Sequence, residues 1–343
     1  MIGKTNFERI VGGTKNDKEE AAKTLQEIFE SKSARLGDRQ IEKSAEDLEI
    51  LRITESLVDE IITQYGGTPQ HVLLDQIYFL KPGGVAEATS GDISGGVCTP
   101  LILKIGIDRN ESNLLFACSI AHELFHLKSY KSARIGQNTE DVRVYRSGIT
   151  LTDIKDKSKK LGEEKIYFEH IEEAIVSECV KKFYEEVGKN SLFASDFEAL
   201  KKIRDWIVAS RRRAGAPEET NKKIESELKY VSRPQELVAQ VLAYSDNEEL
   251  RQDYASGAVD SKLQNSEVEI FERYEERSAL YKLLDKLVEG SKGKYENRDQ
   301  IFNEFARANF SGNYLPLARI VEDILGKGSF RKIAEEFNVE NKK

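Results

Sequence analysis

Two histidines and one glutamate form the pattern in this sequence that could carry out chemistry. His122 and His126 lie four residues apart in the stretch AHELFH, residues 121–126, and Glu123 follows the first histidine. Residues at i and i+4 of an α-helix lie on one face, so both imidazole rings could bind a single Zn²⁺ ion. Glu123 could then act as a general base towards a water molecule at the metal, which is the chemistry that the pattern HExxH predicts. The alternative interpretation is a helix with two hydrogen-bonded core histidines.

The residues around this motif predict the helix that must carry it. Apolar side chains occupy most positions between 114 and 127, which is typical of a helix buried on nearly all sides. A capping box of Asp108 and Glu111 would start this helix, with Asn110 or Asn113 as an alternative cap. A buried helix must supply partners for its histidines and its glutamate, so the burial favours a metal site.

A catalytic zinc ion needs a third protein ligand, which a second helix would provide. Periodic apolar residues predict this helix over about 168–187. Glu173 is the predicted ligand, because two histidines, one glutamate and a water form a known catalytic set. His170, one turn earlier, is the alternative ligand. Without the histidine pair, Glu172, Glu173 and Glu178 would be interpreted as a solvated acidic face.

Extended segments are predicted on both sides of the motif. Residues 71–80 and 97–107 have the composition of strands, and a glycine-rich loop lies between them at 83–96. Pro100 favours an edge position for the second strand, because proline cannot donate to a neighbouring strand. An edge strand just before the metal helix could hold an extended peptide as an added strand. After the motif, residues 142–168 predict a hairpin or an excursion of the chain over the site.

Helices are predicted before and after this central region. Apolar residues at helical spacing predict helices over 17–32 and 38–65. The same spacing predicts a succession of helices from Asn190 onward. The expected fold class is therefore α+β, with a small mixed sheet in the middle of the chain. The expected divisions are an N-terminal helical segment at 1–70, a catalytic core at 71–190 and an all-helical C-terminal region at 191–343.

Composition limits the classes of function. The chain has 52 basic and 60 acidic residues, a net charge of −8, which argues against nucleic-acid binding because that function needs a basic surface. Three cysteines at no metal-ligand spacing favour a reducing compartment. The start of the chain has no apolar segment typical of a signal peptide, and no apolar run reaches about 18 residues. We therefore expect a cytoplasmic protein with no membrane partner.

The motif HELFH, followed by the stretch EEAIVS at 172–177, resembles the gluzincin group of zinc metallopeptidases over residues 71–190. The resemblance implies a zincin-like core, in which a small mixed sheet lies beside an active-site helix and a glutamate helix. It implies one Zn²⁺ ion per chain, bound by His122, His126 and Glu173, with Glu123 as the general base. It also implies a peptide or protein substrate, aligned by the edge strand at 97–107.

The sequence departs from that family at two places. Thermolysin-like members have an aspartate four residues after the third ligand, which orients the first histidine, whereas this chain has Ser177. Another residue must then orient the ligands, because outer partners set the tautomer and basicity of a metal-bound imidazole. The group that stabilises the oxyanion is not evident, and Tyr167, Tyr184, Arg143 and Arg146 are the candidates.

Two other functions fit the same sequence. A protein with a zincin fold could act on, or sense, a single protein partner, as do proteins similar to the ImmA/IrrE regulators. The helices after residue 190 would then form the surface that recognises this partner. The other possibility is a helical scaffold in which the HExxH pattern has no function. Binding of one metal ion per chain separates both metal-dependent functions from the scaffold.

Overall fold

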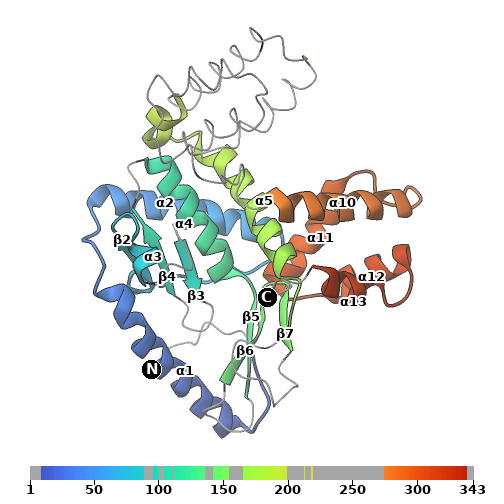
Figure 1. Cartoon of the computed structure of the whole chain (residues 1–343), viewed down its shortest axis with the longest axis horizontal. Coiled ribbons are helices and arrows are strands. Elements are labelled where there is room, and N and C mark those ends of the chain that lie inside the picture. Colours follow the sequence, from blue (N-terminus) through green and yellow to red (C-terminus); the bar gives the residue numbers. More distant parts are fainter. Residues whose placement is uncertain are drawn as a thin grey trace.

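The computed structural model describes residues 9–88, 96–99, 104–109, 112–135, 142–153, 165–198, 212, 218 and 274–337. Helices and two small sheets make up this part of the chain, so the predicted mixed α+β class is confirmed (Figure 1). None of the helices in these residues has the length and apolar character needed to cross a membrane. The division of the chain at residues 70 and 190 stays a prediction.

The N-terminal part contains a short strand and two long helices. They are β1 (Arg9–Val11), α1 (Lys15–Gly37) and α2 (Ala45–Gln64). The predicted helix over 38–65 begins later than expected because Ser44 and Asp47 form a capping box. Asp47 N donates to Ser44 Oγ at 3.1 Å, and Ser44 N donates to Asp47 Oδ2 at 3.0 Å.

A three-stranded sheet precedes the HExxH motif. It contains β2 (Ile77–Leu80), β3 (Gly96–Thr99) and β4 (Lys104–Asp108), in the order β2-β4-β3. The prediction of one strand over 97–107 is wrong, because this segment folds back and β3 pairs antiparallel with β4. In the described residues β2 and β3 are therefore the two edge strands of this sheet, while β4 lies in the centre and pairs parallel with β2. Pro100, which led to the edge prediction, lies outside the described residues.

The segments beside β2 also differ from the prediction. The strand expected over 71–80 starts with a 3-10 turn, Leu74–Gln76, so only its second half is extended. The loop expected at 83–96 contains a short helix, α3 (Gly84–Ala88). Asp108 stabilises its start, because its carboxylate accepts from Gly83 N and from Val85 N, each at 2.9 Å.

The second sheet has five strands in the order β1-β5-β6-β7-β8. Its later strands are β5 (Lys131–Ile135), β6 (Val142–Ser147), β7 (Thr150–Asp153) and β8 (Lys165–Tyr167). The hairpin predicted within 142–168 is confirmed by the antiparallel pairing of β6 with β7. Gly148 makes the turn with a φ of +56°, which favours glycine. Strand β5, directly after the motif, was not predicted.

Helices form the rest of the described chain. The helix after the second sheet is α5 (Glu169–Val187), and the C-terminal helices are α10 (Tyr274–Gly290), α11 (Arg298–Ser311), α12 (Leu315–Leu325) and α13 (Ser329–Glu336). Their positions confirm the helices predicted for these segments. The helices predicted between 199 and 273 lie outside the described residues, apart from Arg212 and Glu218. Both α10 and α11 contact α5 (Figure 1).

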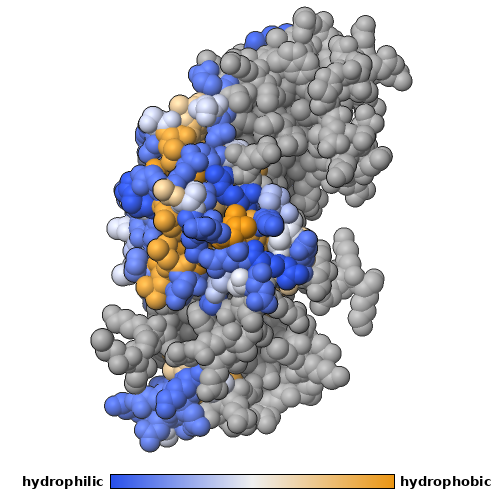
Figure 2. All heavy atoms as spheres, turned by 90° about the vertical axis from the view of Figure 1, so that its left-hand side faces the viewer, coloured by the Kyte–Doolittle hydropathy of each residue, from blue (hydrophilic) through white to orange (hydrophobic). Residues whose placement is uncertain are grey.

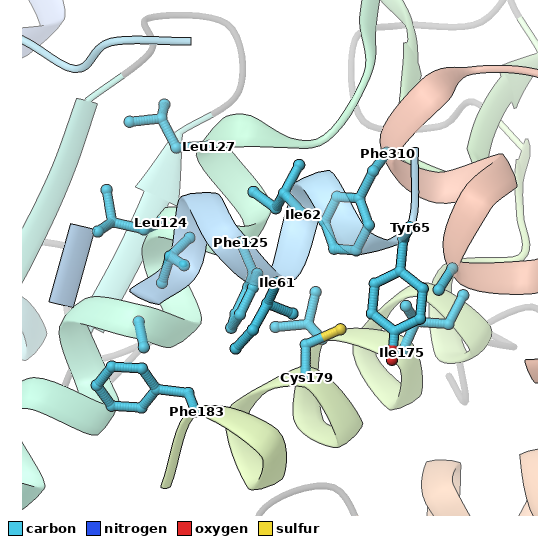
Figure 3. Packing of buried hydrophobic residues seen from close by; sticks show 14 of the residues in the cluster. Ile61, Ile62, Tyr65, Leu124, Phe125, Leu127, Ile175, Cys179, Phe183 and Phe310 are labelled. Carbon is cyan, nitrogen blue, oxygen red and sulfur yellow. The ribbon is translucent and has the colours of Figure 1, made fainter. Parts of the chain in front are cut away.

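One hydrophobic core joins these elements. Figure 3 shows α2, α4 (Asn113–Lys128) and α5 meeting with buried side chains between them. Phe310 of α11 enters the same core, with its ring centroid 6.1 Å from that of Tyr65 and 6.0 Å from that of Phe125. Among the coloured residues of Figure 2, hydrophilic ones predominate and hydrophobic ones form smaller groups among them. Because Phe310 lies in this core, the C-terminal helices share it with the helix that carries the motif.

Candidate metal centre

Helix α4 carries the HExxH motif in the middle of the molecule. Its N-cap is Ser112, whose Oγ accepts from Leu115 N at 3.1 Å. The predicted capping box of Asp108 and Glu111 is wrong, because Asp108 ends β4 and its carboxylate binds the start of α3 instead. Eleven of the sixteen residues of α4 are buried and the other five are half-buried, so the helix lies inside the protein as its apolar sequence predicts.

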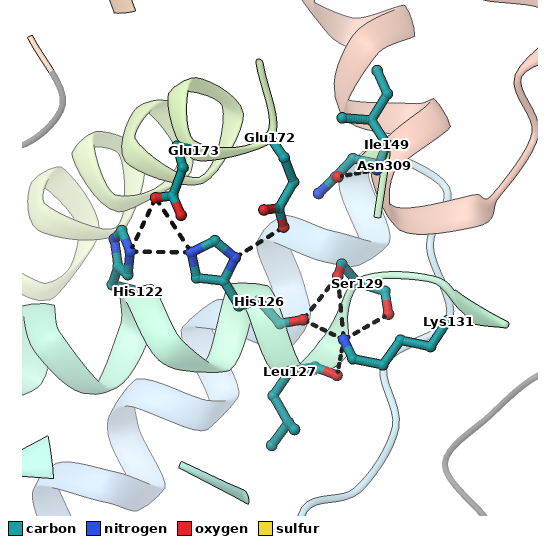
Figure 4. Close-up of polar contacts among 9 residues, drawn as sticks. All are labelled: His122, His126, Leu127, Ser129, Lys131, Ile149, Glu172, Glu173 and Asn309. Carbon is teal, nitrogen blue, oxygen red and sulfur yellow. Dashed lines mark hydrogen bonds and ion pairs between the residues drawn. The ribbon is translucent and has the colours of Figure 1, made fainter. Parts of the chain in front are cut away.

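A buried lysine stabilises the end of this helix. Lys131 is 1% exposed, and its ammonium group donates to three backbone carbonyl oxygens at the C-terminus of α4. These are the carbonyls of His126, Leu127 and Ser129 (Figure 4). A positive charge at this end complements the helix dipole and satisfies carbonyl groups that have no partner in the helix.

Lys131→Met is therefore expected to lower the free energy of unfolding by about 2–4 kcal/mol, since it removes charged hydrogen bonds in a buried place. Urea unfolding of the metal-free protein followed by circular dichroism measures this change. Lys189→Met is the matched control, because the side chain of Lys189 is 70% exposed and forms a surface ion pair with Glu186. An equal effect of the two substitutions would show that the cap does not stabilise the protein.

Three predicted ligands from two helices come together at the site. His122 Nε2 and His126 Nε2 are 3.1 Å apart, and Glu173 Oε2 lies 3.7 Å from the first and 3.6 Å from the second (Figure 4). Among the described residues these three form the group that could hold a metal ion. All three are largely buried, with 13–19% of each side chain exposed. The structure therefore brings the predicted ligand set together.

The spacing of these donor atoms fits a zinc ion. Two ligands about 2.1 Å from a tetrahedral zinc ion lie about 3.4 Å from each other. The three observed separations, 3.1, 3.6 and 3.7 Å, lie on both sides of this value. Two imidazole nitrogens and a carboxylate oxygen are also donors that zinc prefers. An ion could enter this site with only small movements of the side chains.

Glu172 lies beside the candidate ligands, although the sequence analysis did not assign it to the site. Its carboxylate is buried and accepts a hydrogen bond of 2.8 Å from His126 Nδ1. Because a carboxylate only accepts, the Nδ1 proton is fixed and Nε2 is left to face the ligand group. Ser177, at the position of the orienting aspartate, makes no side-chain hydrogen bond with any described residue. The orienting carboxylate found here therefore acts on the second histidine rather than the first.

The two glutamates also set the charge of His126. Burial lowers the pKa of His126, but the negative charges of Glu172 and Glu173 outweigh burial and hold this pKa well above its ordinary value. The protonated form of His126 is therefore favoured in the metal-free site. A metal ion must displace this proton, so metal affinity decreases as the pH falls.

Glu123 lies against the edge strand. It is 7% exposed, and a Cβ atom built on Gly96 of β3 would be only 2.6 Å from Glu123 Oε1. The absence of a side chain at Gly96 therefore makes room for this carboxylate. Glu123 is not part of the ligand group. The geometry thus separates the proposed base from the proposed ligands, although the residues are adjacent in sequence.

The start of α5 is held by the C-terminal helices. Phe168, the residue before α5, is buried and has a φ of +64°, which is uncommon for a residue other than glycine. Phe168 N donates to Ala334 O and His170 N donates to Phe337 O, each at 3.4 Å. These carbonyls, at the end of α13, bind N–H groups that have no partner within α5. The turn that carries both site glutamates is therefore fixed from outside its own helix.

Two other candidate residues, His170 and Glu178, contact α10. His170, the alternative ligand, has its Nδ1 3.7 Å from Glu276 Oε1 of α10. Glu178 accepts a hydrogen bond of 2.7 Å from Arg277. None of the three glutamates is therefore on a solvated face, since Glu172, Glu173 and Glu178 have side chains only 9%, 19% and 15% exposed.

Two of the four candidates for stabilising an oxyanion are also engaged away from the ligand group. Arg146 is buried and donates to the carbonyls of Gly148 and Ala308, at 2.9 and 3.0 Å. The ring of Tyr184 is buried and packs against Phe197, with centroids 4.9 Å apart. The side chain of Arg143 lies outside the described residues, and Tyr167 is half-buried on β8.

No protein-family model, curated protein or solved structure matches this chain. What bears on the function of this chain is the geometry of the candidate site. That geometry consists of two histidines on one face of α4, a glutamate from α5 beside both, and a second glutamate bound to the outer nitrogen of His126. A third glutamate lies next to the edge of a sheet.

Proposed function

We propose that this protein is a zinc-dependent peptide hydrolase with a zincin-like core of the gluzincin type. His122, His126 and Glu173 would hold one zinc ion per chain. The observation that supports this proposal best is the convergence of three donor atoms at separations of 3.1–3.7 Å, from residues that the HExxH…E pattern selects. Sequence spacing alone does not place Glu173 beside the histidines, whereas the packing of α5 against α4 does.

The proposed catalytic residue is Glu123. The zinc ion, when bound, supplies Lewis acidity that makes a water more acidic and polarises the substrate carbonyl. Glu123 takes the proton from the attacking water and passes it to the nitrogen of the leaving amine. Its carboxylate is buried and lies against the edge strand β3, next to the helix that carries the two histidines. Glu172 holds His126 in the tautomer that leaves Nε2 for the ion.

The proposed substrate is an extended peptide. Strand β3 is at the edge of its sheet in the described part of the chain, and α4 packs beside it. An extended peptide could add to this edge through backbone hydrogen bonds, which would bring one of its carbonyls towards the site. Gly96 supports this arrangement, since the edge strand and the proposed base meet there. The same edge would serve a protein that acts on a single partner.

Metal content of protein purified without added metal tests this proposal first. We expect about one zinc per parent chain, and much weaker binding by His126→Ala and Glu173→Ala, since each removes one of three ligands. His170→Ala is the matched control and should keep its zinc, because His170 faces Glu276. A parent chain without zinc after reconstitution contradicts the proposal, and zinc retained by Glu173→Ala contradicts the ligand set.

A further inference from the structure

The turn between β6 and β7 joins the C-terminal helices to the metal centre. Asn309, on α11, is fully buried, and its Oδ1 accepts a hydrogen bond of 2.8 Å from the backbone N–H of Ile149 in this turn (Figure 4). Arg146 fixes the same turn, since it donates to the carbonyls of Gly148 and Ala308. Two buried side chains therefore hold the turn against the end of α11.

The hydrogen bond to Ile149 also fixes the orientation of the Asn309 amide. Because Oδ1 faces a donor, the Nδ2 group must be on the opposite side. Nδ2 is buried and makes no hydrogen bond to any residue in the described part of the chain. Figure 4 shows this nitrogen on the side of Asn309 that faces Glu172. Buried amide donors are rarely left without an acceptor, so the position of Nδ2 points to a polar role.

Gly148 brings Asn309 and Glu172 close to each other. A Cβ atom built on Gly148 would lie 2.1 Å from Asn309 Oδ1 and 3.3 Å from Glu172 Cγ, so both side chains pack against the same glycine. Glu172 uses Oε1 to accept from His126 Nδ1. An ionised carboxylate can accept further hydrogen bonds, and Oε2 is the other acceptor of this group.

We propose that Asn309 is a positioning residue of the metal centre. Its amide group donates to the Glu172 carboxylate in the metal-loaded protein and holds that carboxylate against His126. This inference rests on the proposed zinc site. It assigns a role to the C-terminal helices, because α11 then acts on a zinc ligand through Glu172 without touching the ion. Outer partners of this kind change metal affinity by about 10- to 100-fold.

Asn309→Asp tests this role while keeping the shape of the side chain. The variant retains an oxygen that accepts from Ile149, but it replaces the donor that faces Glu172 by a second acceptor. Zinc affinity is measured by competition with a chromogenic chelator, and the absorption spectrum of the Co²⁺-loaded protein reports the ligand geometry. We expect about 10-fold weaker zinc binding and an altered spectrum. Asn303→Asp, exposed on the same helix, adds the same charge and should change neither.

The same substitution in a Glu172→Ala background separates positioning from a general structural effect. With the carboxylate removed, Asn309→Asp should change zinc affinity by less than about 2-fold, because the group through which Asn309 acts is gone. Unchanged affinity in the single variant, or an equal loss in both backgrounds, would overturn the positioning role alone. A parent chain that binds no zinc would overturn the proposed function together with it.

Discussion

Glu123→Gln is expected to bind zinc as tightly as the parent chain and to lose about 10²- to 10⁴-fold in the rate of peptide hydrolysis. Glutamine has almost the same shape as glutamate, so packing against Gly96 is kept. It cannot take a proton from water, so only the proposed base is removed. The measurement is cleavage of a quenched fluorescent peptide library by the zinc-loaded protein, with zinc content determined on the same samples.

The ligand variants provide the comparison for this result. His126→Ala should lose hydrolysis because it loses zinc, whereas Glu123→Gln should lose hydrolysis with its zinc in place. A Glu123→Gln protein that cleaves as fast as the parent would contradict the role of Glu123 as base. Cleavage of one protein, with no cleavage of the library by the parent chain, would favour the alternative in which this fold acts on a single partner.

Sequence spacing was enough to predict the parts of the site that lie on regular helices. His122 and His126 are one turn apart, so a single helix determines their relation whatever surrounds it. The apolar residues around them predict that α4 is buried, and the periodicity of 168–187 predicts α5 to within a residue at its start. The choice of Glu173 needed more than periodicity, namely the requirement for a third ligand.

The residues that were missed depend on contacts between segments far apart in the chain. Glu172 has no local sign that separates it from Glu173, since only the packing of α5 on α4 decides which carboxylate meets which nitrogen of His126. The pair Glu172 and Glu173, close to His170 in the sequence, was the available signal, and only Glu173 was given a role. Asn309 is still more distant in the sequence. It lies near Glu172 because both side chains pack against the turn at Gly148.

The strands show a different kind of error. Residues 97–107 have the composition of a strand throughout, so composition could not show that β3 and β4 are two strands that pair with each other. The burial of Lys131 was not predictable from its residue type, because a lysine is usually exposed unless its charge is paired. Here its partners are the carbonyl groups at the end of α4, which no side-chain pattern can reveal.

The position of Gly96 leads to a second large expected effect, on catalysis but not on metal binding. In Gly96→Ala, the new Cβ would lie 2.6 Å from Glu123 Oε1 and 3.1 Å from its Cδ, so the carboxylate must move. A displacement of about 1 Å at a catalytic group can cost about 10²-fold in rate. We therefore expect about 10²-fold slower peptide hydrolysis with unchanged zinc content, because the three ligands are on α4 and α5.

Gly37→Ala is the control for this substitution, since among the described residues its Cβ would meet only Tyr78, at an ordinary contact distance of 3.8 Å. It should hydrolyse peptides at the parent rate. If Gly96→Ala also kept the parent rate, the Glu123 carboxylate would not need the space beside β3, and the edge strand would have no part in catalysis. If it lost zinc as well as activity, the strand would instead support the ligand helix, because then the whole of α4 would have moved.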